Sequence, residues 1–171
     1  MKALFAAACL FAALAFPAAA PESGDGSFVG KLAPAFTLTD LSGKKIDLQS
    51  YRGKAVVQIV GWAAWCHGCR EEIPRLKEAY ERYHRSGFEI LALTGPYGQD
   101  LEKVRSFARE FSLPYPVLFD SGTKVLELYR INSVPTNLIL DREGRVVYEG
   151  SQLPEDYEKR IEKLLSPSRS G

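Results

Sequence analysis

The chain has 171 residues, which is enough for one domain with a hydrophobic core and too few for two domains of ordinary size. Hydrophobic residues make up 46% of it and charged residues 25%, close to the globular average, which argues against a disordered chain or a coiled coil. The formal net charge is +1 and no basic run exceeds two residues, so nothing in the composition favours a nucleic acid as partner.

Residues 1–20 have the layout of a secretory signal peptide. Lys2 is followed by an uncharged apolar run, residues 3–16, and then by small residues that suit cleavage after Ala20. The run is shorter than the roughly 20 residues of a transmembrane helix, so we expect export with cleavage, and a retained interfacial anchor is the alternative. Cys9 lies inside this segment and would be removed with it, which leaves two cysteines.

The first part of the remaining chain predicts a leader, a hairpin, a strand and a helix. We expect a flexible leader over residues 21–31, which are polar and rich in Gly and Ser. Residues 35–51 predict a β-hairpin around the turn LSGKK. The β-branched run AVVQIVGW, residues 55–62, predicts a central strand that is covered on both faces. After the cysteines, spacings of three and four predict an amphipathic helix with Ile73, Leu76, Tyr80 and Tyr83 on its apolar side.

The second part continues this alternation of strands and helices. The expected elements are a strand at 88–93, a helix at 99–112, a strand at 116–119, a short helix at 123–130, a hairpin of strands at 136–140 and 145–150 around DREG, and a helix near 154–165. This order implies one α/β domain, residues 32–165, with a central mixed β-sheet flanked by helices. We expect residues 166–171 to form a disordered tail.

Cys66 and Cys69 stand in the stretch WCHGCREEIP, and three kinds of chemistry fit the pair. As a structural staple, a disulfide across so short a loop would contribute only about 2 kcal/mol to stability. As a metal site, the pair would need further ligands, and the mature chain offers only His67 and His84, although two thiolates could hold Cu(I) weakly. Covalent haem attachment requires a histidine directly after the second cysteine, where Arg70 stands.

The third interpretation is a redox-active pair. A strand runs into the motif and a helix runs out of it, so Cys66 should lie at a helix N-terminus, where unpaired N–H groups and the helix dipole lower the pKa of a thiol. Cys66 would then be the attacking sulfur, and Cys69, one turn further on, would resolve the mixed disulfide. No bound cofactor is expected besides this disulfide. Glu71 and Glu72 suit the first turn of the helix, and Pro74 is expected to kink it.

The motif WAAWCHGCREEIP, the strand before it, and SVPTNLIL about seventy residues later resemble the thioredoxin superfamily. The leader APAFTLTDLSGKKIDLQSYRGK and an extra helix-strand segment near residues 99–119 are similar, more narrowly, to its exported TlpA/ResA-like branch, which includes cytochrome c maturation reductases. This resemblance implies a thioredoxin-like fold with an N-terminal β-hairpin and a helix-strand insertion. It also implies that Pro135 follows a cis peptide bond and lies against the cysteines, and that Val134 offers its backbone to an extended substrate segment.

The sequence departs from the thioredoxin pattern in three ways. Val60 stands where thioredoxins carry a buried acid, so that proton acceptor for the second cysteine is absent. Gly61 replaces a bulky residue, and His67 and Gly68 form an unusual dipeptide between the cysteines. A protonated His67 could stabilise the neighbouring thiolate and favour an oxidant, or it could face solvent with little effect. Trp65 is expected to form part of an apolar docking surface.

The sequence as a whole predicts an extracytoplasmic thiol-disulfide oxidoreductase. The resemblance implies that it reduces protein disulfides, that a membrane electron donor recharges it, and that cytochrome c maturation is its setting. The expected partners are protein disulfides or dithiols and a membrane electron-donor protein, and no nucleic acid. We expect a monomer in the bacterial periplasm or on the extracytoplasmic face of the membrane. Three alternatives stay open: a disulfide-donating oxidant, a thiol peroxidase and a non-catalytic Cu(I) carrier. A peroxidase would want a threonine shortly before the attacking cysteine, where Ala63 and Ala64 stand.

Overall fold

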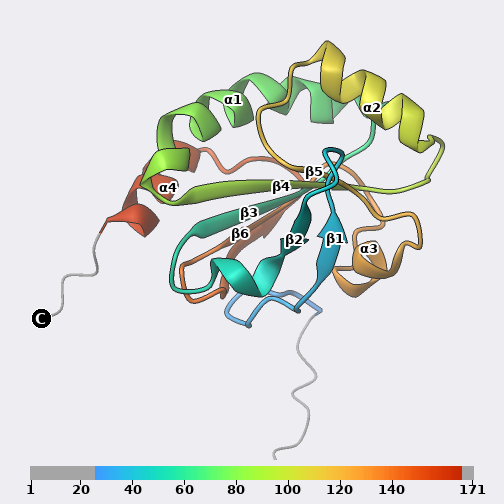
Figure 1. The fold of residues 1–171 in the computed structure, drawn as a ribbon. Helices are drawn as coiled ribbons and strands as arrows, with labels where there is room; N and C mark the ends of the chain where they lie inside the picture. The colour runs from blue at the N-terminus through green and yellow to red at the C-terminus, as the bar shows by residue number, and fades with distance from the viewer. Residues whose placement is uncertain (1–25, 167–171) are drawn as a thin grey trace, which may run out of the picture.

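The computed structural model describes residues 26–166 (Figure 1). The predicted signal peptide and the tail beyond Ser166 lie outside the described residues. The elements in chain order are β1 (Thr37–Thr39), β2 (Lys45–Asp47), the 3-10 helix η1 (Leu48–Tyr51), β3 (Val56–Gly61), α1 (His67–Tyr83), η2 (His84–Ser86), β4 (Phe88–Thr94), α2 (Leu101–Glu110), β5 (Val117–Phe119), α3 (Lys124–Leu128), β6 (Thr136–Leu140), β7 (Val146–Gly150) and α4 (Tyr157–Leu165). No helix within the described range is long and apolar enough to span a bilayer.

The main sheet has five strands in the order β5-β4-β3-β6-β7, with β3 at its centre. β3 pairs in parallel with β4, and β4 with β5, whereas β6 runs antiparallel to both β3 and β7. All six residues of β3 are buried, because the sheet is covered on both faces. The predicted mixed α/β sheet is therefore confirmed.

The two faces of the sheet bury two separate hydrophobic clusters. Alternate strand residues point to opposite faces, so neighbouring positions of one strand belong to different clusters. One face packs under α1, α2 and α4, with Val56, Val60, Ile73, Leu76, Ile90, Val104, Phe107, Ile139, Tyr157 and Ile161 in its core. The other face packs against α3 and the segment of β1 and β2, with Phe36, Ile46, Val57, Ile59, Leu91, Leu93, Leu118, Val125, Leu126 and Leu138.

The predicted N-terminal hairpin is present as the two-stranded sheet of β1 and β2. Its turn is closed by Asp40, whose carboxylate accepts hydrogen bonds from the backbone N–H groups of Ser42 (2.8 Å) and Lys44 (2.9 Å). Gly43 adopts a φ of +91°, a left-handed conformation that favours glycine. The hairpin therefore forms for the reason its sequence indicates.

The leader is attached to the domain along its described part, residues 26–31. The N–H of Gly30 donates to the carbonyl of Val146 at 2.8 Å, and the N–H of Val146 donates to the carbonyl of Lys31 at 2.9 Å. These bonds lie at the start of β7, where Val29 of the leader forms an isolated parallel β-bridge with Val146. The expectation of a flexible leader therefore does not describe residues 26–31, because their polar backbone finds partners at an open sheet edge.

Several helices differ from their expected bounds. The helix expected at 99–112 begins at Leu101, because the Asp100 carboxylate caps it by accepting the N–H of Lys103 at 2.8 Å. The helix expected at 154–165 begins only at Tyr157. Pro74 lies inside α1, which continues past it to Tyr83.

Candidate active site

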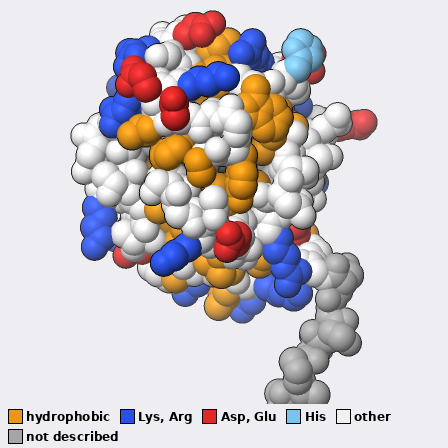
Figure 2. Space-filling model, turned by 90° about the vertical axis from the view of Figure 1, so that its right-hand side faces the viewer, with side chains coloured by type: hydrophobic (Ala, Val, Ile, Leu, Met, Phe, Trp, Pro, Cys, Tyr) orange, Lys and Arg blue, Asp and Glu red, His pale blue; other side chains and the backbone are white. Residues whose placement is uncertain are grey.

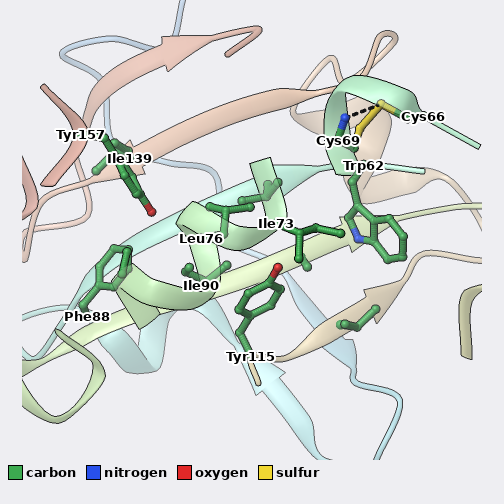
Figure 3. Packing of buried hydrophobic residues seen from close by; sticks show 14 of the residues in the cluster. Trp62, Cys66, Cys69, Ile73, Leu76, Phe88, Ile90, Tyr115, Ile139 and Tyr157 are labelled. Carbon is green, nitrogen blue, oxygen red and sulfur yellow. Dashed lines mark hydrogen bonds between the residues drawn. A yellow bond between two sulfur atoms is a disulfide. The ribbon is translucent and has the colours of Figure 1, made fainter. Parts of the chain in front are cut away.

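The central strand β3 leads to the start of α1, and this connection fixes the position of Cys66. The backbone of Cys66 is extended (φ −80°, ψ 111°), so the residue caps α1 and does not belong to its first turn. Its sulfur accepts a hydrogen bond from the backbone N–H of Cys69 at 3.1 Å (Figure 3). A capping Ser or Asp would use an oxygen in this role. The expected placement of Cys66 at a helix N-terminus is confirmed, and its surroundings favour a negative charge on the sulfur.

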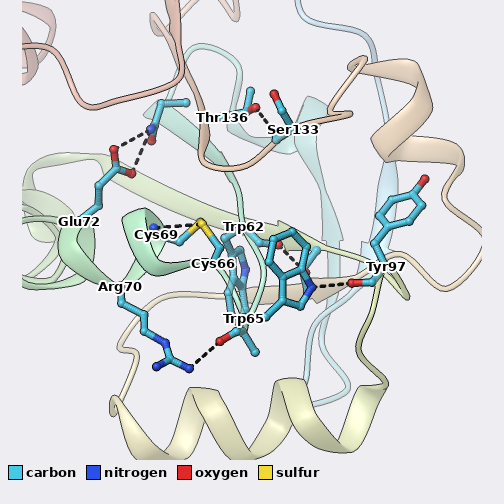
Figure 4. Close-up of a disulfide and its surroundings, with 12 residues drawn as sticks. Trp62, Trp65, Cys66, Cys69, Arg70, Glu72, Tyr97, Ser133 and Thr136 are labelled. Atoms are coloured by element: carbon cyan, nitrogen blue, oxygen red, sulfur yellow. Dashed lines mark hydrogen bonds between the residues drawn. A yellow bond between two sulfur atoms is a disulfide. The ribbon is translucent and has the colours of Figure 1, made fainter.

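Cys66 and Cys69 form a disulfide, with their Cα atoms 5.3 Å apart (Figure 4). Each residue is only 5% exposed. A partner protein can therefore reach the sulfur atoms only by lying directly on the surrounding surface. The shape and chemistry of that surface decide which partners fit.

The loop before the disulfide is anchored to the connection between β4 and α2. The Ala64 N–H donates to the side-chain oxygen of Gln99 at 2.7 Å, and the Gln99 amide nitrogen donates to the Thr94 hydroxyl (2.6 Å) and the Gly95 carbonyl (3.0 Å). The Thr94 hydroxyl in turn donates to the carbonyl of Trp62 at 2.6 Å. Gln99 thus fixes the loop from the side, a role that its sequence context did not indicate.

Trp65 is the exposed aromatic residue next to the disulfide, as the expected docking surface requires. It is 53% exposed, and its indole N–H donates to the carbonyl of Tyr97 at 2.7 Å. A hollow of about 280 Å³ opens beside it. Trp65 and Tyr97 line this hollow together with Leu126 of α3 and, from the segment after α3, Arg130 and Val134. Figure 2 shows hydrophobic side chains gathered on the face to which the carboxyl ends of β3 and β4 point.

The peptide bond between Val134 and Pro135 is cis, as the resemblance implied. The Pro135 ring lies against the dipeptide between the cysteines, because a Cβ atom added to Gly68 would lie 3.6 Å from its Cδ atom. Val134 lines the hollow beside Trp65. The structure therefore brings together the cysteine pair, Trp65, Val134 and Pro135, all of which were candidate site residues.

Two of the three departures from the thioredoxin pattern have a packing explanation. Val60 belongs to the apolar cluster that also contains Cys69, so no acid lies at that point beneath the second cysteine. A side chain at Gly61 has no room, because its Cβ would lie 2.6 Å from the Ile131 Cγ2 atom and 3.3 Å from the Thr136 Cβ atom. Glycine at this position lets Ile131 pack directly on β3.

His67 points into solvent, with a side chain that is 88% exposed. Its Nε2 atom lies 3.3 Å from the Glu71 carboxylate, one helical turn further on. Both side chains are largely exposed, so solvent weakens any interaction between them. The position of His67 thus permits the tuning role that its sequence suggested, and that role stays a prediction.

Glu72 is a site residue that the sequence analysis missed. We placed it with Glu71 in the first turn of α1, but α1 begins at His67 and its first turn contains no acid, so both lie in the next turn. Glu72 is three residues after Cys69 and lines a second hollow, of about 320 Å³, together with Gly68 and Pro135. Its carboxylate accepts hydrogen bonds from the Leu153 N–H (2.9 Å) and from the Asn137 amide (3.1 and 3.3 Å).

Burial raises the pKa of the Glu72 carboxyl above its ordinary value, against the opposite effect of these hydrogen bonds and of Arg75. A signal for this environment is present in the sequence. Gln58 lies in the middle of the apolar strand β3, and Asn137 precedes the apolar run of β6. A buried polar residue needs a partner. Among the described residues, no group of three or more His, Cys, Asp or Glu side chains could hold a metal ion.

A disulfide of the CxxC type that caps the helix after the central strand and faces a cis-proline loop defines a thiol-disulfide oxidoreductase of thioredoxin fold. Residues 29–149 match the sequence model of the AhpC/TSA family, and the chain belongs to this family. This confirms the predicted thioredoxin-like fold and the resemblance on which it was based.

The thiol-disulfide oxidoreductase ResA of Bacillus cereus is 37% identical over 138 residues, which cover 80% of this chain and 78% of the relative. Among solved structures, the thioredoxin domain of a thiol-disulfide oxidoreductase from Bacteroides vulgatus is 28% identical with a TM-score of 0.71, over 81% of this chain and 98% of that one. A thiol:disulfide interchange protein from a Bacteroides species is 27% identical with a TM-score of 0.70, over 84% and 93%. The comparisons thus confirm the predicted enzyme class, a thiol-disulfide oxidoreductase similar to ResA.

Proposed function

We propose that this enzyme acts outside the cytoplasm and reduces disulfides of partner proteins, with Cys66 as the attacking and Cys69 as the resolving cysteine. The observation that carries the proposal is the hydrogen bond from the Cys69 N–H to the Cys66 sulfur at the start of α1. The same donor and the helix dipole would stabilise the Cys66 thiolate once the disulfide is reduced. The reduced Cys66–Cys69 dithiol itself carries the two electrons, so the chemistry needs no bound cofactor.

The proposed exchange has two steps. The Cys66 thiolate attacks one sulfur of the partner disulfide, a new S–S bond forms, and the second partner sulfur leaves as a thiolate. The Cys69 thiol then loses its proton and attacks the Cys66 sulfur, which releases the first partner sulfur with its electron pair. The enzyme ends as the Cys66–Cys69 disulfide and the partner has gained two electrons. An external dithiol must reduce the enzyme again before the next cycle.

The surface around the disulfide supports a protein substrate. An extended segment that pairs with the backbone of Val134 would lie across Pro135 and bring its own sulfur to Cys66. The apolar hollow beside Trp65 would then receive a side chain close to the substrate cysteine. Trp65, Val134 and Pro135 are therefore the proposed substrate-binding residues.

Glu72 is the proposed acceptor of the Cys69 proton. It lies one turn after Cys69 on the same helix, and it lines the hollow that reaches Gly68 and Pro135 beside the disulfide. In its ionised form the carboxylate can take the proton that the resolving thiol must lose. Glu72 would thus be the proton acceptor that is missing at position 60, where thioredoxins carry a buried acid.

The reducing direction and the location are inferred from different features. The signal-like segment 1–20 supports export, and the similarity to ResA supports a reductant that a membrane electron donor recharges, with cytochrome c maturation as the setting. His67 is the feature that would favour an oxidant, because an imidazolium beside Cys66 stabilises the thiolate and so the reduced form.

The test replaces Cys69 with serine in the native host and isolates what becomes covalently attached to Cys66. A Cys66→Ser/Cys69→Ser double variant controls for non-specific capture. The proposal predicts exported partner proteins that dithiothreitol releases and that are oxidised in a strain without the enzyme. If no partner is captured and the oxidation state of the Cys66–Cys69 pair does not respond to dithiol buffers, the result contradicts thiol-disulfide exchange. If the partners are over-reduced in the strain without the enzyme, the result contradicts the reducing direction.

A further inference from the structure

Four polar side chains form one chain of hydrogen bonds through the apolar layer between the sheet and helices α1 and α4. The Tyr157 hydroxyl donates to the side-chain oxygen of Gln58, and the Gln58 amide nitrogen donates to the side-chain oxygen of Asn137 at 2.9 Å. The Asn137 amide nitrogen then donates to both oxygens of Glu72 at 3.1 and 3.3 Å. Gln58, Asn137 and Tyr157 have no exposed surface, so each bond replaces a lost contact with water.

All bonds of this chain point in the same direction, toward Glu72. An amide side chain has a donor end and an acceptor end, so fixing one end also fixes the other. A carboxylate only accepts, which requires Asn137 to present its nitrogen to Glu72 and its oxygen to Gln58. The same reasoning turns the Gln58 oxygen toward Tyr157, whose hydroxyl must then donate. The observed arrangement is therefore the one that fits an ionised Glu72.

The charge of Glu72 depends on these donors, because burial acts against it and the nearest cation is shared. Burial raises the pKa of the carboxyl, while Arg75 on the same helix lowers it. Arg75, however, forms its ion pair with Glu158 of α4, at 2.6 Å. The other ionisable groups that face Glu72 or line its hollow are Glu71 on α1, Tyr115 before β5, Tyr148 on β7 and Tyr157 on α4. None of them is a cation, so the hydrogen-bond donors are the main compensation for burial.

We propose that Asn137, oriented by Gln58 and Tyr157, is a positioning residue that keeps Glu72 ionised beside the cysteine pair. Its consequence for exchange depends on the proposed function, in which Glu72 takes the proton of the Cys69 thiol. The resulting thiolate supplies the electron pair for the new bond to the Cys66 sulfur, and the partner sulfur leaves with the pair of the broken bond. Tyr157 lies at the far end of the chain and acts only through the two amides.

The direct test is a carboxyl ¹³C NMR titration of Glu72 in the oxidised protein and in three variants. Asn137→Leu removes two bonds to the carboxylate, and we expect the pKa of Glu72 to rise by about one unit or more. Tyr157→Phe removes only the donor at the end of the chain farthest from Glu72. The Gln58 and Asn137 amides can then turn, and we expect a smaller rise in the pKa of Glu72. Tyr83→Phe is the control, because it removes the hydroxyl of another tyrosine, which donates to Glu162 between α1 and α4, outside the chain.

The result that would overturn the inference is a Glu72 pKa that is the same in Tyr157→Phe as in the wild type, or that moves equally in Tyr83→Phe. If Asn137→Leu does not fold, the milder Tyr157→Phe variant decides on its own. A second readout separates this inference from the proposed function: the pH dependence of the rate at which Cys69 resolves a mixed disulfide. A pKa of Glu72 that shifts as expected supports the positioning role of Asn137. If the pH midpoint of the resolution rate does not shift with it, only the assignment of Glu72 as proton acceptor fails.

Discussion

At the scale of single residues, small differences in local space decide which positions of the motif tolerate change. Gly61 and Gly68 lie on either side of the first cysteine and are both glycines, yet their surroundings differ. The side chain of Ile131 fills the space that a Cβ at Gly61 would need, whereas the Pro135 ring leaves ordinary contact distance at Gly68. The sequence alone shows two glycines, and only the packing shows that one of them is required.

Gly61→Ala should therefore destabilise the oxidised protein and Gly68→Ala should not. An added Cβ at Gly61 would lie 2.6 Å from the Ile131 Cγ2 atom, so the strand or the isoleucine must shift, at a cost of about 1–3 kcal/mol. The Cβ at Gly68 would lie 3.6 Å from Pro135, and we expect no loss there. Urea unfolding of both variants gives the two free energies. Equal stabilities would contradict the packing explanation for glycine at position 61.

At the scale of elements, the position of the disulfide depends on three connections. The junction of β3 and α1 supplies the cysteines, the segment before β6 supplies Val134 and Pro135, and the segment between β4 and α2 holds the loop before Cys66 in place. The last of these works through Gln99, which accepts the N–H of the buried residue Ala64 at 2.7 Å. A buried N–H without a partner is costly, so this contact should be measurable.

Gln99→Ala should lower the free energy of unfolding by about 1–3 kcal/mol, because the N–H of Ala64 loses its acceptor. It should also weaken substrate binding, since the loop carries Trp65. Gln49→Ala is the control, because the Gln49 side chain, on η1, makes no hydrogen bond to any residue that the structure describes. Chemical unfolding and the KM for a disulfide-linked peptide are the measurements. Indistinguishable effects of the two substitutions would show that Gln99 does not hold the loop.

At the scale of the whole molecule, the sequence predicted the order of strands and helices because hydrophobic periodicity and turn residues are local signals. The helix N-terminus at Cys66 was predictable for the same reason. The chain from Tyr157 through Gln58 and Asn137 to Glu72 was not, because its members lie far apart in sequence and meet only when the sheet forms. The cis bond before Pro135 came from the resemblance alone, since sequence physics gives it a low frequency.

Two acidic residues in different surroundings should give the folded protein opposite dependences on pH. Burial raises the pKa of Glu89. The contribution of Glu89 to stability is therefore fully present below about pH 4.3, the usual pKa of an unfolded Glu, and is lost as pH rises through the pKa of Glu89 in the folded protein. The hydrogen bond from Arg75 lowers the pKa of Glu158, so its contribution is present above about pH 4.3 and is lost as pH falls.

Relative to the wild type, Glu89→Gln should therefore gain stability as pH rises above about 4.3, and Glu158→Gln should lose stability as pH rises toward that value. Thermal or urea unfolding of the three proteins between about pH 3 and 7 measures both differences. Differences that are flat with pH, or that run in the same direction, would contradict the assigned surroundings.

The most direct test of the whole account is the pH titration of the Cys66 thiol in the reduced enzyme. The rate of alkylation of Cys66 in a Cys69→Ser background, measured across the pH range, gives its pKa. The N–H at position 69 and the start of α1 predict a pKa well below the value of about 8.5 for free cysteine. A thiol that titrates at or above that value would show that the helix start does not hold the sulfur ionised, and the proposed attack by Cys66 would lose its physical basis.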